Sequence, residues 1–308
     1  MTGNPCLTTR LGRVTLVNPV LAASGVFGFA REYAQLFPVS ALGGVVVKGL
    51  TLEPRAGNPP PRLVETPAGL LNAVGLQNPG VKAFVREELP RLRDLGTKVI
   101  ANIAGFTPEE FGRLAKILDR QQGLAALELN ISCPNVKKGG MAFGVIPETA
   151  ALITRLVREE TSLPVWVKLS PNVTNITEIA AAVVEAGAEV ISLVNTLAGM
   201  AIDIEKRRPV LGNIYGGLSG PAIKPVALRM VWQVYRETAV PLVGIGGITN
   251  SRDALEFIMA GASAVAVGTG FFTDPFVPQK IVAGLRRFLV KKQEKSIEDL
   301  VGAAHRET

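Results

Sequence analysis

The sequence predicts an α/β protein and, within that class, a (β/α)8 TIM barrel with βα-loop excursions over its C-terminal face. Apolar residues make up 47% of the 308-residue chain but aromatic residues only 6%, so aliphatic side chains dominate. That composition suits buried parallel strands covered by helices. Eight short apolar runs alternate with helical periodicities, and eight such units in about 250 residues form a closed barrel. A doubly wound open sheet is the alternative.

The expected strands are short runs rich in β-branched residues, each followed by a polar or glycine-containing turn. In chain order they are 19–23, 44–47, 98–103, 125–131, 164–169, 189–194, 241–245 and 264–267. Alternation of strand and helix makes the strands parallel, with right-handed crossovers. Their carboxyl ends therefore meet at one face, where barrels of this kind carry their ligand sites.

Helices are expected between the strands, where apolar residues recur at i, i+3, i+4 and i+7. Two clear sets are Phe111, Leu114, Ala115, Leu118 and Ile176, Ile179, Ala180, Val183. The sequence Thr107-Pro108-Glu109-Glu110 predicts the start of the first helix, with an N-cap Thr, a first-turn Pro and a capping-box Glu. Gly187 and Gly261 each lie in an Ala-Gly-Ala segment before a strand, which suits the left-handed residue that ends a helix.

Two long connections interrupt the regular pattern. Residues 51–80 are rich in Pro and Gly and cannot form a regular helix, so they are expected to fold over the barrel mouth. Residues 136–147 include Lys137-Lys138-Gly139-Gly140, whose glycines suit a mobile lid. No linker or change of composition divides the chain, so residues 1–308 are expected to form a single domain.

Composition excludes several classes of site. The two cysteines, Cys6 and Cys133, are too few for a disulfide framework or a four-thiolate cluster, and Cys6 is expected to be structural. His305, in the charged tail, is the single histidine, so no metal site and no histidine-based triad are expected. Because no apolar run is long enough to cross a membrane and no leader is apparent, a soluble, cytoplasmic protein is expected. The net charge of +7 does not choose among anionic ligands, an acidic partner and nucleic acid.

The residues that follow the strands are mostly polar or glycine, and they are expected to face one cavity. They are Ser24, Lys48, Asn102, Asn130 with Cys133, Lys168, Asn195 with Thr196, Gly246 with Gly247, and Gly268 with Thr269. The glycine pairs favour a phosphate, because backbone N–H groups approach phosphate oxygens only where no Cβ intrudes. A strand-end lysine indicates an anion partner or a Schiff base. Cys133 is the sharpest candidate for chemistry and needs a cationic neighbour such as Lys48 to become a thiolate.

Together these motifs resemble the dihydroorotate dehydrogenase family, flavin enzymes of pyrimidine biosynthesis. The resemblance covers nearly the whole chain and rests on Asn72-Ala73-Val74-Gly75-Leu76-Gln77-Asn78, Asn130-Ile131-Ser132-Cys133-Pro134-Asn135, Lys168-Leu169-Ser170-Pro171, Asn195-Thr196, Gly246-Gly247-Ile248 and Gly268-Thr269. The membrane-associated class has a serine at the base position and a preceding hydrophobic helix, whereas this chain has Cys133. Residues 137–144 are similar to the lid of the class IB catalytic subunit.

The resemblance implies site residues for FMN and for dihydroorotate or its product orotate. FMN would be held by Ser24, Lys48, Gly49, Asn102, Asn130, Lys168, Val194, Gly220, Gly246, Gly247, Gly268 and Thr269. Dihydroorotate would be held by Lys48, Asn72, Ala73, Val74, Gly75, Leu76, Asn130, Asn195 and Thr196. In the implied reaction Cys133 removes the C5 proton while a hydride leaves C6 for the flavin, and Lys168 stabilises the negative charge that forms on the reduced flavin.

The path of the electrons beyond this chain is implied by the resemblance alone. A partner subunit carrying FAD and a [2Fe–2S] centre would pass them to NAD⁺, with a homodimer of this chain inside a heterotetramer and no nucleic-acid or membrane partner. A fumarate-linked class IA enzyme is the alternative. More remote alternatives are a tRNA dihydrouridine synthase-like flavoprotein, a lyase with a Schiff base at Lys168, and a non-enzymatic ligand-binding barrel. Residues 268–308 are too few for the helical RNA-binding domain of the synthase.

Overall fold

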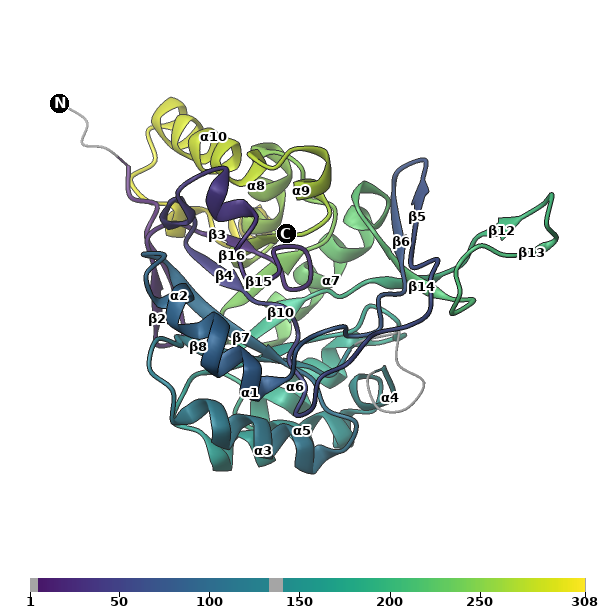
Figure 1. The fold of residues 1–308 in the computed structure, drawn as a ribbon. Helices are drawn as coiled ribbons and strands as arrows, with labels where there is room; N and C mark the ends of the chain where they lie inside the picture. The colour runs from purple at the N-terminus through teal and green to yellow at the C-terminus, as the bar shows by residue number, and fades with distance from the viewer. Residues whose placement is uncertain (1–4, 133–140, 308) are drawn as a thin grey trace.

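The computed structural model describes residues 5–132 and 141–307, and in them eight parallel strands close into one barrel (Figure 1). The strands are β3 (Val20–Ala22), β4 (Gly44–Val46), β7 (Lys98–Ile103), β8 (Ala126–Asn130), β9 (Val165–Lys168), β10 (Val190–Leu193), β15 (Leu242–Ile245) and β16 (Ala262–Val267). Each pairs with the next along the chain, and β16 pairs with β3 to close the ring. The predicted (β/α)8 TIM barrel is confirmed, and the open sheet is wrong.

Helices cover the outside of the barrel between successive strands. They are α1 (Val81–Ala83), α2 (Leu89–Arg93), α3 (Pro108–Asp119), α4 (Met141–Gly144), α5 (Pro147–Glu160), α6 (Ile176–Glu185), α7 (Lys224–Glu237), α8 (Ser251–Met259), α9 (Gly270–Thr273) and α10 (Val277–Lys292). A turn of π-helix, η3 (Phe84–Glu88), joins α1 to α2. The short 3-10 segments η4 (Pro221–Ile223), η5 (Ile297–Leu300) and η6 (Ala303–Glu307) precede α7 and follow α10.

The first strand–helix unit departs from the expected alternation. Between β3 and β4 the chain forms two 3-10 turns, η1 (Tyr33–Gln35) and η2 (Val39–Ala41), and no α-helix. Gly25 and Gly28 have positive φ angles there, which an α-helix does not allow. The C-terminal α10 packs against β3 and covers it in place of the missing helix.

The helix signals in the sequence are confirmed, except for one half of a capping box. The apolar sets of α3 and α6 are buried, and Gly187 and Gly261 have positive φ angles as expected for residues that end helices. Thr107 caps α3 by accepting from the N–H of Glu110. The carboxylate of Glu110, however, accepts from the N–H of Phe106 at 2.7 Å, one residue before the N-cap. The reciprocal bond of a capping box is therefore displaced by one residue.

The two longest connections build a second sheet beside the barrel mouth. β5 (Leu63–Thr66) and β6 (Gly69–Asn72) come from the first connection, while β11 (Leu197–Gly199) and β14 (Gly216–Ser219) come from the segment after β10. They pair antiparallel in the order β11-β14-β6-β5. The expectation that residues 51–80 fold over the mouth is confirmed, because Leu63, Leu70 and Asn72 line the cavity there. Residues 136–140 of the expected lid lie outside the described residues.

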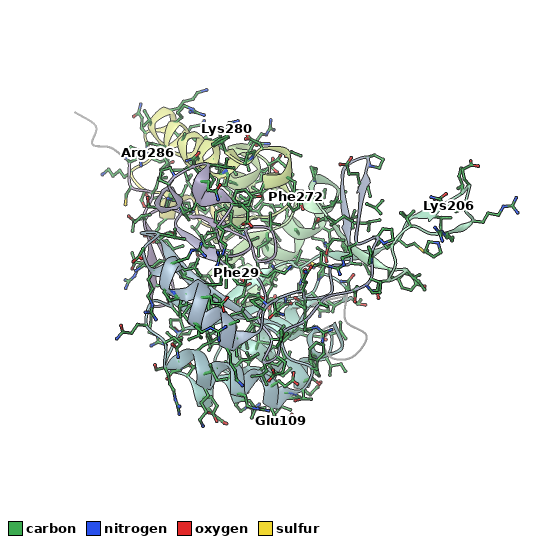
Figure 2. All side chains as sticks on the ribbon, in the orientation of Figure 1. Phe29, Glu109, Lys206, Phe272, Lys280 and Arg286 are labelled. Atoms are coloured by element: carbon green, nitrogen blue, oxygen red, sulfur yellow. The ribbon has the colours of Figure 1, made fainter. Side chains whose placement is uncertain are left out.

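Two hairpins lie outside the barrel wall. β12 (Ile202–Asp203) and β13 (Arg208–Pro209) form an arm that extends away from the body, with Lys206 near its tip (Figures 1 and 2). β1 (Thr9–Leu11) and β2 (Val14–Leu16) pair near the N-terminus and bury Leu11 and Leu16 against the apolar interior of the barrel. The side chain of Cys6 is exposed, and its backbone pairs with the segment before η5.

The barrel interior changes character along its axis. Towards the amino ends of the strands it is apolar, with Leu21, Val46, Ile100, Trp166 and Val243 in one buried cluster. Towards the carboxyl ends the buried side chains are polar: Asn102, Glu128, Asn130, Lys168 and Ser192. Polar groups buried in this way need hydrogen-bond partners or a ligand. None of the helices in the described ranges is long and apolar enough to cross a membrane.

Candidate active site

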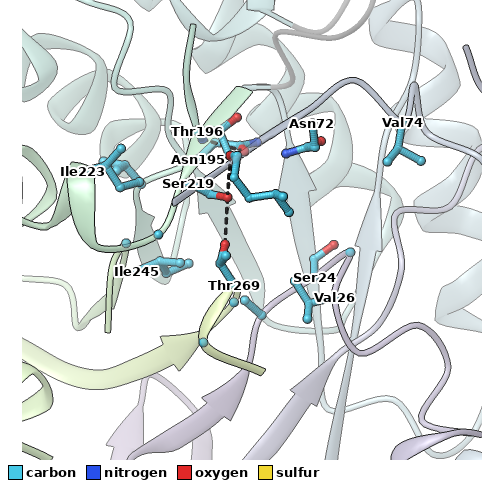
Figure 3. Close-up of a pocket in the computed structure, with 18 of the residues that line it drawn as sticks. Ser24, Val26, Asn72, Val74, Asn195, Thr196, Ser219, Ile223, Ile245 and Thr269 are labelled. Carbon is cyan, nitrogen blue, oxygen red and sulfur yellow. Dashed lines mark hydrogen bonds between the residues drawn. The ribbon is translucent and has the colours of Figure 1, made fainter. Parts of the chain in front are cut away.

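A cavity lies between the carboxyl ends of the barrel strands and the β11-β14-β6-β5 sheet (Figure 3). It brings together most of the residues that the sequence singled out. The predicted residues that line it are Ser24, Lys48, Gly49, Asn72, Val74, Gly75, Leu76, Asn130, Lys168, Val194, Asn195, Thr196, Gly220, Gly246, Gly247, Gly268 and Thr269. Residues more than 240 positions apart in the chain thus share one wall, which is what closure of a barrel achieves.

Three predicted residues stand apart from this wall. Asn102 is fully buried behind Gly49, where a Cβ added to Gly49 would lie 2.8 Å from the Asn102 Oδ1. Ala73 turns its side chain into a small apolar cluster with Leu71 and Leu211. Cys133 lies outside the described residues, so its role stays a prediction.

The cavity carries positive charge without a carboxylate on its wall. Lys48 and Lys168 both line it, and no Asp or Glu of the described ranges does. The side chain of Lys168 is buried, and no described residue forms a hydrogen bond or ion pair with its ammonium. A buried cation that the protein leaves without an anion favours an anionic ligand, because desolvation makes the isolated charge unfavourable.

One end of the cavity is made of glycine backbone. Gly246 and Gly247 have φ angles of +131° and +72°, in the region that side chains rarely adopt. Gly268 differs, because a Cβ added there would meet no protein atom closer than 3.8 Å. Space at Gly268 is therefore left for something other than the protein. Beside it, the Thr269 Oγ1 donates to the Ser219 Oγ at 2.7 Å (Figure 3).

An ion pair between the buried Asp253 and the half-buried Lys224 supports this end from outside. The Asp253 carboxylate accepts from the Lys224 Nζ at 2.7 Å and from both the N–H and the hydroxyl of Thr249. Burial raises the pKa of Asp253, but these hydrogen bonds outweigh it and hold the pKa below 3.8. Burial likewise lowers the pKa of Lys224, and its bonds to Asp253 and Glu256 outweigh that effect and raise it. The pair thus fixes the loop that follows Gly246 and Gly247.

The expected helix N-terminus beside the glycines is already capped. Asn250 precedes α8, and its Oδ1 accepts from the N–H groups of Arg252 and Asp253. Neither Asn250 nor Ser251 lines the cavity, whereas Thr249 does. The glycine backbone, and not the start of α8, is therefore the part that faces a ligand.

The other end of the cavity is lined by carboxamides. Asn72 comes from β6, Asn130 from β8, and Asn195 follows β10. Asn172, which the sequence analysis did not single out, orders the loop around Asn195: it donates to the Thr196 carbonyl at 3.0 Å and accepts from the Ala198 N–H at 2.8 Å. Asn172 lies two residues after Ser170, and its Nδ2 also donates to the Ser170 Oγ. The sequence could not indicate its role, because Thr196 and Ala198 lie more than 20 residues further along the chain.

Sequence reasoning missed the apolar part of the wall and Ser219. These residues are Ala23, Gly25, Val26, Leu63, Leu70, Ser219, Ile223, Ile245, Ile248, Thr249, Gly270 and Phe272. An apolar wall between a glycine-rich end and an amide-lined end suits a flat aromatic ring with polar edges. Several of these residues immediately neighbour a predicted one, which was the available signal. Leu63 and Leu70 reach the cavity through pairing of distant strands and had none.

The residues present fit FMN on two observations. The open space at Gly268, beside the glycine backbone of Gly246 and Gly247, suits a phosphate. The ammonium of Lys168, which has no partner among residues 5–132 and 141–307, lies in the same cavity and suits a ring that gains negative charge. Among the described residues, no group of three His, Cys, Asp or Glu side chains is placed to hold a metal ion.

Comparisons with known proteins agree with this geometry. The family model for dihydroorotate dehydrogenase matches residues 6–289. The chain belongs to the dihydroorotate dehydrogenase family. Relatives of nearly equal length are described as "Dihydroorotate dehydrogenase B (NAD(+)), catalytic subunit". That of Desulforamulus reducens is 57% identical over 97% of this chain and 98% of its own, and that of Desulforudis audaxviator is 58% identical over 95% of each. That of Geotalea daltonii is 55% identical over 97% of this chain and 98% of its own.

Membership of this family decides between the protein classes that the sequence analysis left open. The match extends from the segment before β1 into α10 and so includes every strand of the barrel. The sequence-based assignment to this family is confirmed by it and by the full-length relatives. The tRNA dihydrouridine synthase, the lyase and the non-enzymatic barrel have no support among these relatives.

Proposed function

We propose that this chain is the catalytic subunit of an NAD-linked dihydroorotate dehydrogenase, which oxidises dihydroorotate to orotate in pyrimidine biosynthesis. The observation that carries the proposal is the single cavity that a glycine-rich end, two lysines and three carboxamides line together. The descriptions of the full-length relatives name the same activity. A cytoplasmic location is part of the proposal.

The amide-lined end would bind the substrate. Asn72, Asn130 and Asn195 each offer paired donors and acceptors, which match a ring bearing ureide N–H and C=O groups. Lys48 would meet the carboxylate of dihydroorotate as a point charge. Thr196 follows Asn195 and would complete this end, along with the backbone of the segment Val74–Leu76.

The glycine-lined end and the apolar wall would hold FMN. FMN, when bound, supplies the acceptor for the hydride that leaves C6 of dihydroorotate. Ser24, Gly49 and Val194 line the wall between the two ends, with Gly246, Gly247, Gly268 and Thr269 at the phosphate end. Lys168 would lower the free energy of negative charge beside it without transferring a proton. Residues 63–72 and 216–219 cover the cavity and keep water from the reacting atoms.

Cys133 would be the base that removes the C5 proton. This assignment rests on the motif Asn130-Ile131-Ser132-Cys133, of which Asn130 lines the cavity. A positioned base contributes roughly 10²- to 10⁴-fold to the rate. Cys133→Ala should therefore keep the yellow flavin absorbance but lose turnover of dihydroorotate by about that factor. Cys6→Ala, at an exposed thiol on the N-terminal segment, is the matched control and should keep full turnover. Undiminished turnover in Cys133→Ala would refute the assignment.

A partner subunit with FAD and a [2Fe–2S] centre would carry the electrons to NAD⁺, in a heterotetramer built on a homodimer of this chain. Purified alone, the chain should reduce an artificial acceptor faster than NAD⁺. Efficient NAD⁺ reduction without a partner would contradict this part of the proposal. Efficient fumarate reduction would instead favour the class IA alternative. Absorbance in the visible range that bleaches on addition of dihydroorotate tests the core of the proposal before either acceptor is tried.

A further inference from the structure

A buried carboxylate lies below the amide-lined end of the cavity. Glu128 is on β8, two residues before Asn130, and is 1% exposed. Its two oxygens each accept one hydrogen bond at 2.7 Å, from the Asn102 Nδ2 and from the Ser192 Oγ. Glu128 does not line the cavity, and no ion pair joins it to another described residue. A charge buried so deeply without a cation calls for a reason beyond packing.

The hydrogen bonds above Glu128 all run in the same direction. Asn102 donates to Glu128 through its Nδ2, so its Oδ1 is left to accept from the Asn130 Nδ2 at 3.4 Å. Asn130 then presents its own Oδ1, which accepts from the Ser132 Oγ at 3.4 Å and from the Asn195 Nδ2 at 3.5 Å. Every donor in this chain of amides points toward the floor of the barrel. Glu128 is its terminal acceptor, because each of its two oxygens accepts a hydrogen bond.

The upper end of the same chain is fixed independently. The Thr196 N–H donates to the Asn195 Oδ1 at 2.8 Å, which turns the Asn195 Nδ2 toward Ser132 at 3.0 Å. Asn195 is thereby held as a donor toward Asn130. Asn130 lies between two anchors that agree, a backbone N–H above and a carboxylate below. A carboxamide by itself has two orientations that differ by exchange of oxygen and nitrogen, and here one of them is selected.

We propose that Glu128 is a positioning residue that sets the direction of this amide chain and so decides which atoms Asn130 offers to the substrate. The inference rests on the proposed function, in which Asn130 contacts the pyrimidine ring. With the Asn130 Nδ2 directed to Asn102, its oxygen faces the side of the cavity where Asn195 lies, and a ring N–H would take the place of the long 3.5 Å bond from Asn195. Reversal of Asn102 would put two oxygens or two NH2 groups face to face, and Asn130 would reverse with it.

The chain offers variants that separate charge, hydrogen bonding and direction. Glu128→Gln removes the charge and lets the direction reverse, because the Gln carboxamide can either accept from Asn102 or donate to it. The Ser192 hydroxyl, which is both donor and acceptor, satisfies the remaining Gln atom in each case. Ser192→Ala removes only the other bond of the carboxylate and leaves the bond to Asn102 in place. In the double variant Glu128→Gln with Ser192→Ala, the Gln carboxamide has the same two orientations toward Asn102 without a second partner. The amide chain can therefore reverse in both variants that carry Glu128→Gln, and not in Ser192→Ala.

The test measures the dissociation constant of orotate on the FMN-loaded chain by its perturbation of the flavin absorbance, with thermal unfolding measured in parallel. Ser192→Ala should bind orotate as the wild type does, within about twofold, because it leaves the acceptor for Asn102 in place. Glu128→Gln and the double variant should each bind it about three- to tenfold more weakly, the effect of one net hydrogen bond. Glu128→Met, which removes the acceptor for Asn102, should show the same loss.

Three results would overturn the inference. One is a Glu128→Gln chain whose orotate affinity equals that of the Ser192→Ala chain. Another is a Glu128→Met chain that unfolds at lower temperature yet binds orotate normally, which is the behaviour of a merely structural acid. If Glu128→Met does not fold, the cycle of conservative variants still decides. A wild-type chain that binds no orotate would overturn the proposed function as well, whereas normal wild-type binding with unchanged variants overturns this inference alone.

Discussion

Replacing Gly268 by Ala tests whether the open space in the glycine-lined end belongs to FMN. Gly268 continues the inward alternation of Ala264 and Ala266 on β16, so a new Cβ would project into the cavity. Its nearest protein neighbour would be the Ala23 Cβ at 3.8 Å, an ordinary van der Waals contact. The protein itself should accommodate this methyl group, with a change in unfolding free energy of at most about 1 kcal/mol.

A bound phosphate would not accommodate it. An oxygen that accepts from a backbone N–H lies about 2.9 Å from that nitrogen, which leaves no room for an added methyl group beside the same backbone. Overpacking of this kind costs about 1–3 kcal/mol, so the dissociation constant of FMN should rise by roughly 5- to 150-fold. Titration of the flavin-free chain with FMN, followed by quenching of flavin fluorescence, measures this constant.

A matched control lies far from the cavity. Gly112 is buried on α3, and a Cβ there would likewise meet its nearest atoms at 3.8 Å, on Glu160 and Leu156. Gly112→Ala should leave FMN affinity unchanged and stabilise the helix by about 0.5–1 kcal/mol. FMN binding to Gly268→Ala that equals binding to the wild type would show that the phosphate lies elsewhere, even with every other part of the fold intact.

Two further predictions separate the substrate end from the support of the phosphate end. A Cβ at Gly217 on β14 would lie 2.0 Å from the Thr196 Oγ1, so Gly217→Ala must displace Thr196. The variant should bind orotate about tenfold more weakly and FMN as tightly as the wild type does. Equal loss of affinity for both ligands in parallel titrations would contradict this division. Because the folded pKa of Asp253 lies below 3.8, its stabilising effect is complete above that pH and is lost as the pH falls through the folded value. The melting temperature of the wild type should therefore fall more steeply with decreasing pH below about pH 4. The melting temperature of Asp253→Asn should fall less steeply over the same range. Identical slopes for the two proteins would contradict this role.

The barrel could be predicted from the sequence because its signals are local. Each strand is a continuous apolar run, and the alternation of such runs with helical periodicities fixes the parallel order without knowledge of any distant contact. The second sheet had no such signal. β14 reads Gly-Gly-Leu-Ser, and its partner β6 lies about 145 residues earlier, so neither composition nor periodicity marks it as a strand. The lack of an α-helix between β3 and β4 could not be predicted either, because Gly25 and Gly28 suit a turn before a helix as well as they suit an irregular connection.

The candidate site likewise has a part that could be predicted from local sequence and a part that could not. Residues that directly follow a strand could be found, since the carboxyl ends of parallel strands converge whatever the loops do. Asn172 and Ser219 could not, because their roles depend on loops that meet only in the folded chain. Glu128 lies inside the predicted strand 125–131, and nothing beside it in the sequence indicates a role. Its meaning depends on Ser192 of β10, which the closed barrel places across from it, 64 residues along the chain.

The polar half of the barrel interior is best understood as an arrangement that the ligands complete. Burial of Asn102, Asn130 and Lys168 within a ring of strands is unfavourable unless each polar group is paired. The apolar half below, with Trp166 and Ile100, and the larger core between barrel and helices supply the burial of apolar surface that offsets this cost. Within the polar half, the amides satisfy one another in a single direction and Lys168 has no partner among the described residues. The described residues therefore complete their own hydrogen bonding where orientation matters and leave the Lys168 ammonium for an anionic ligand to meet.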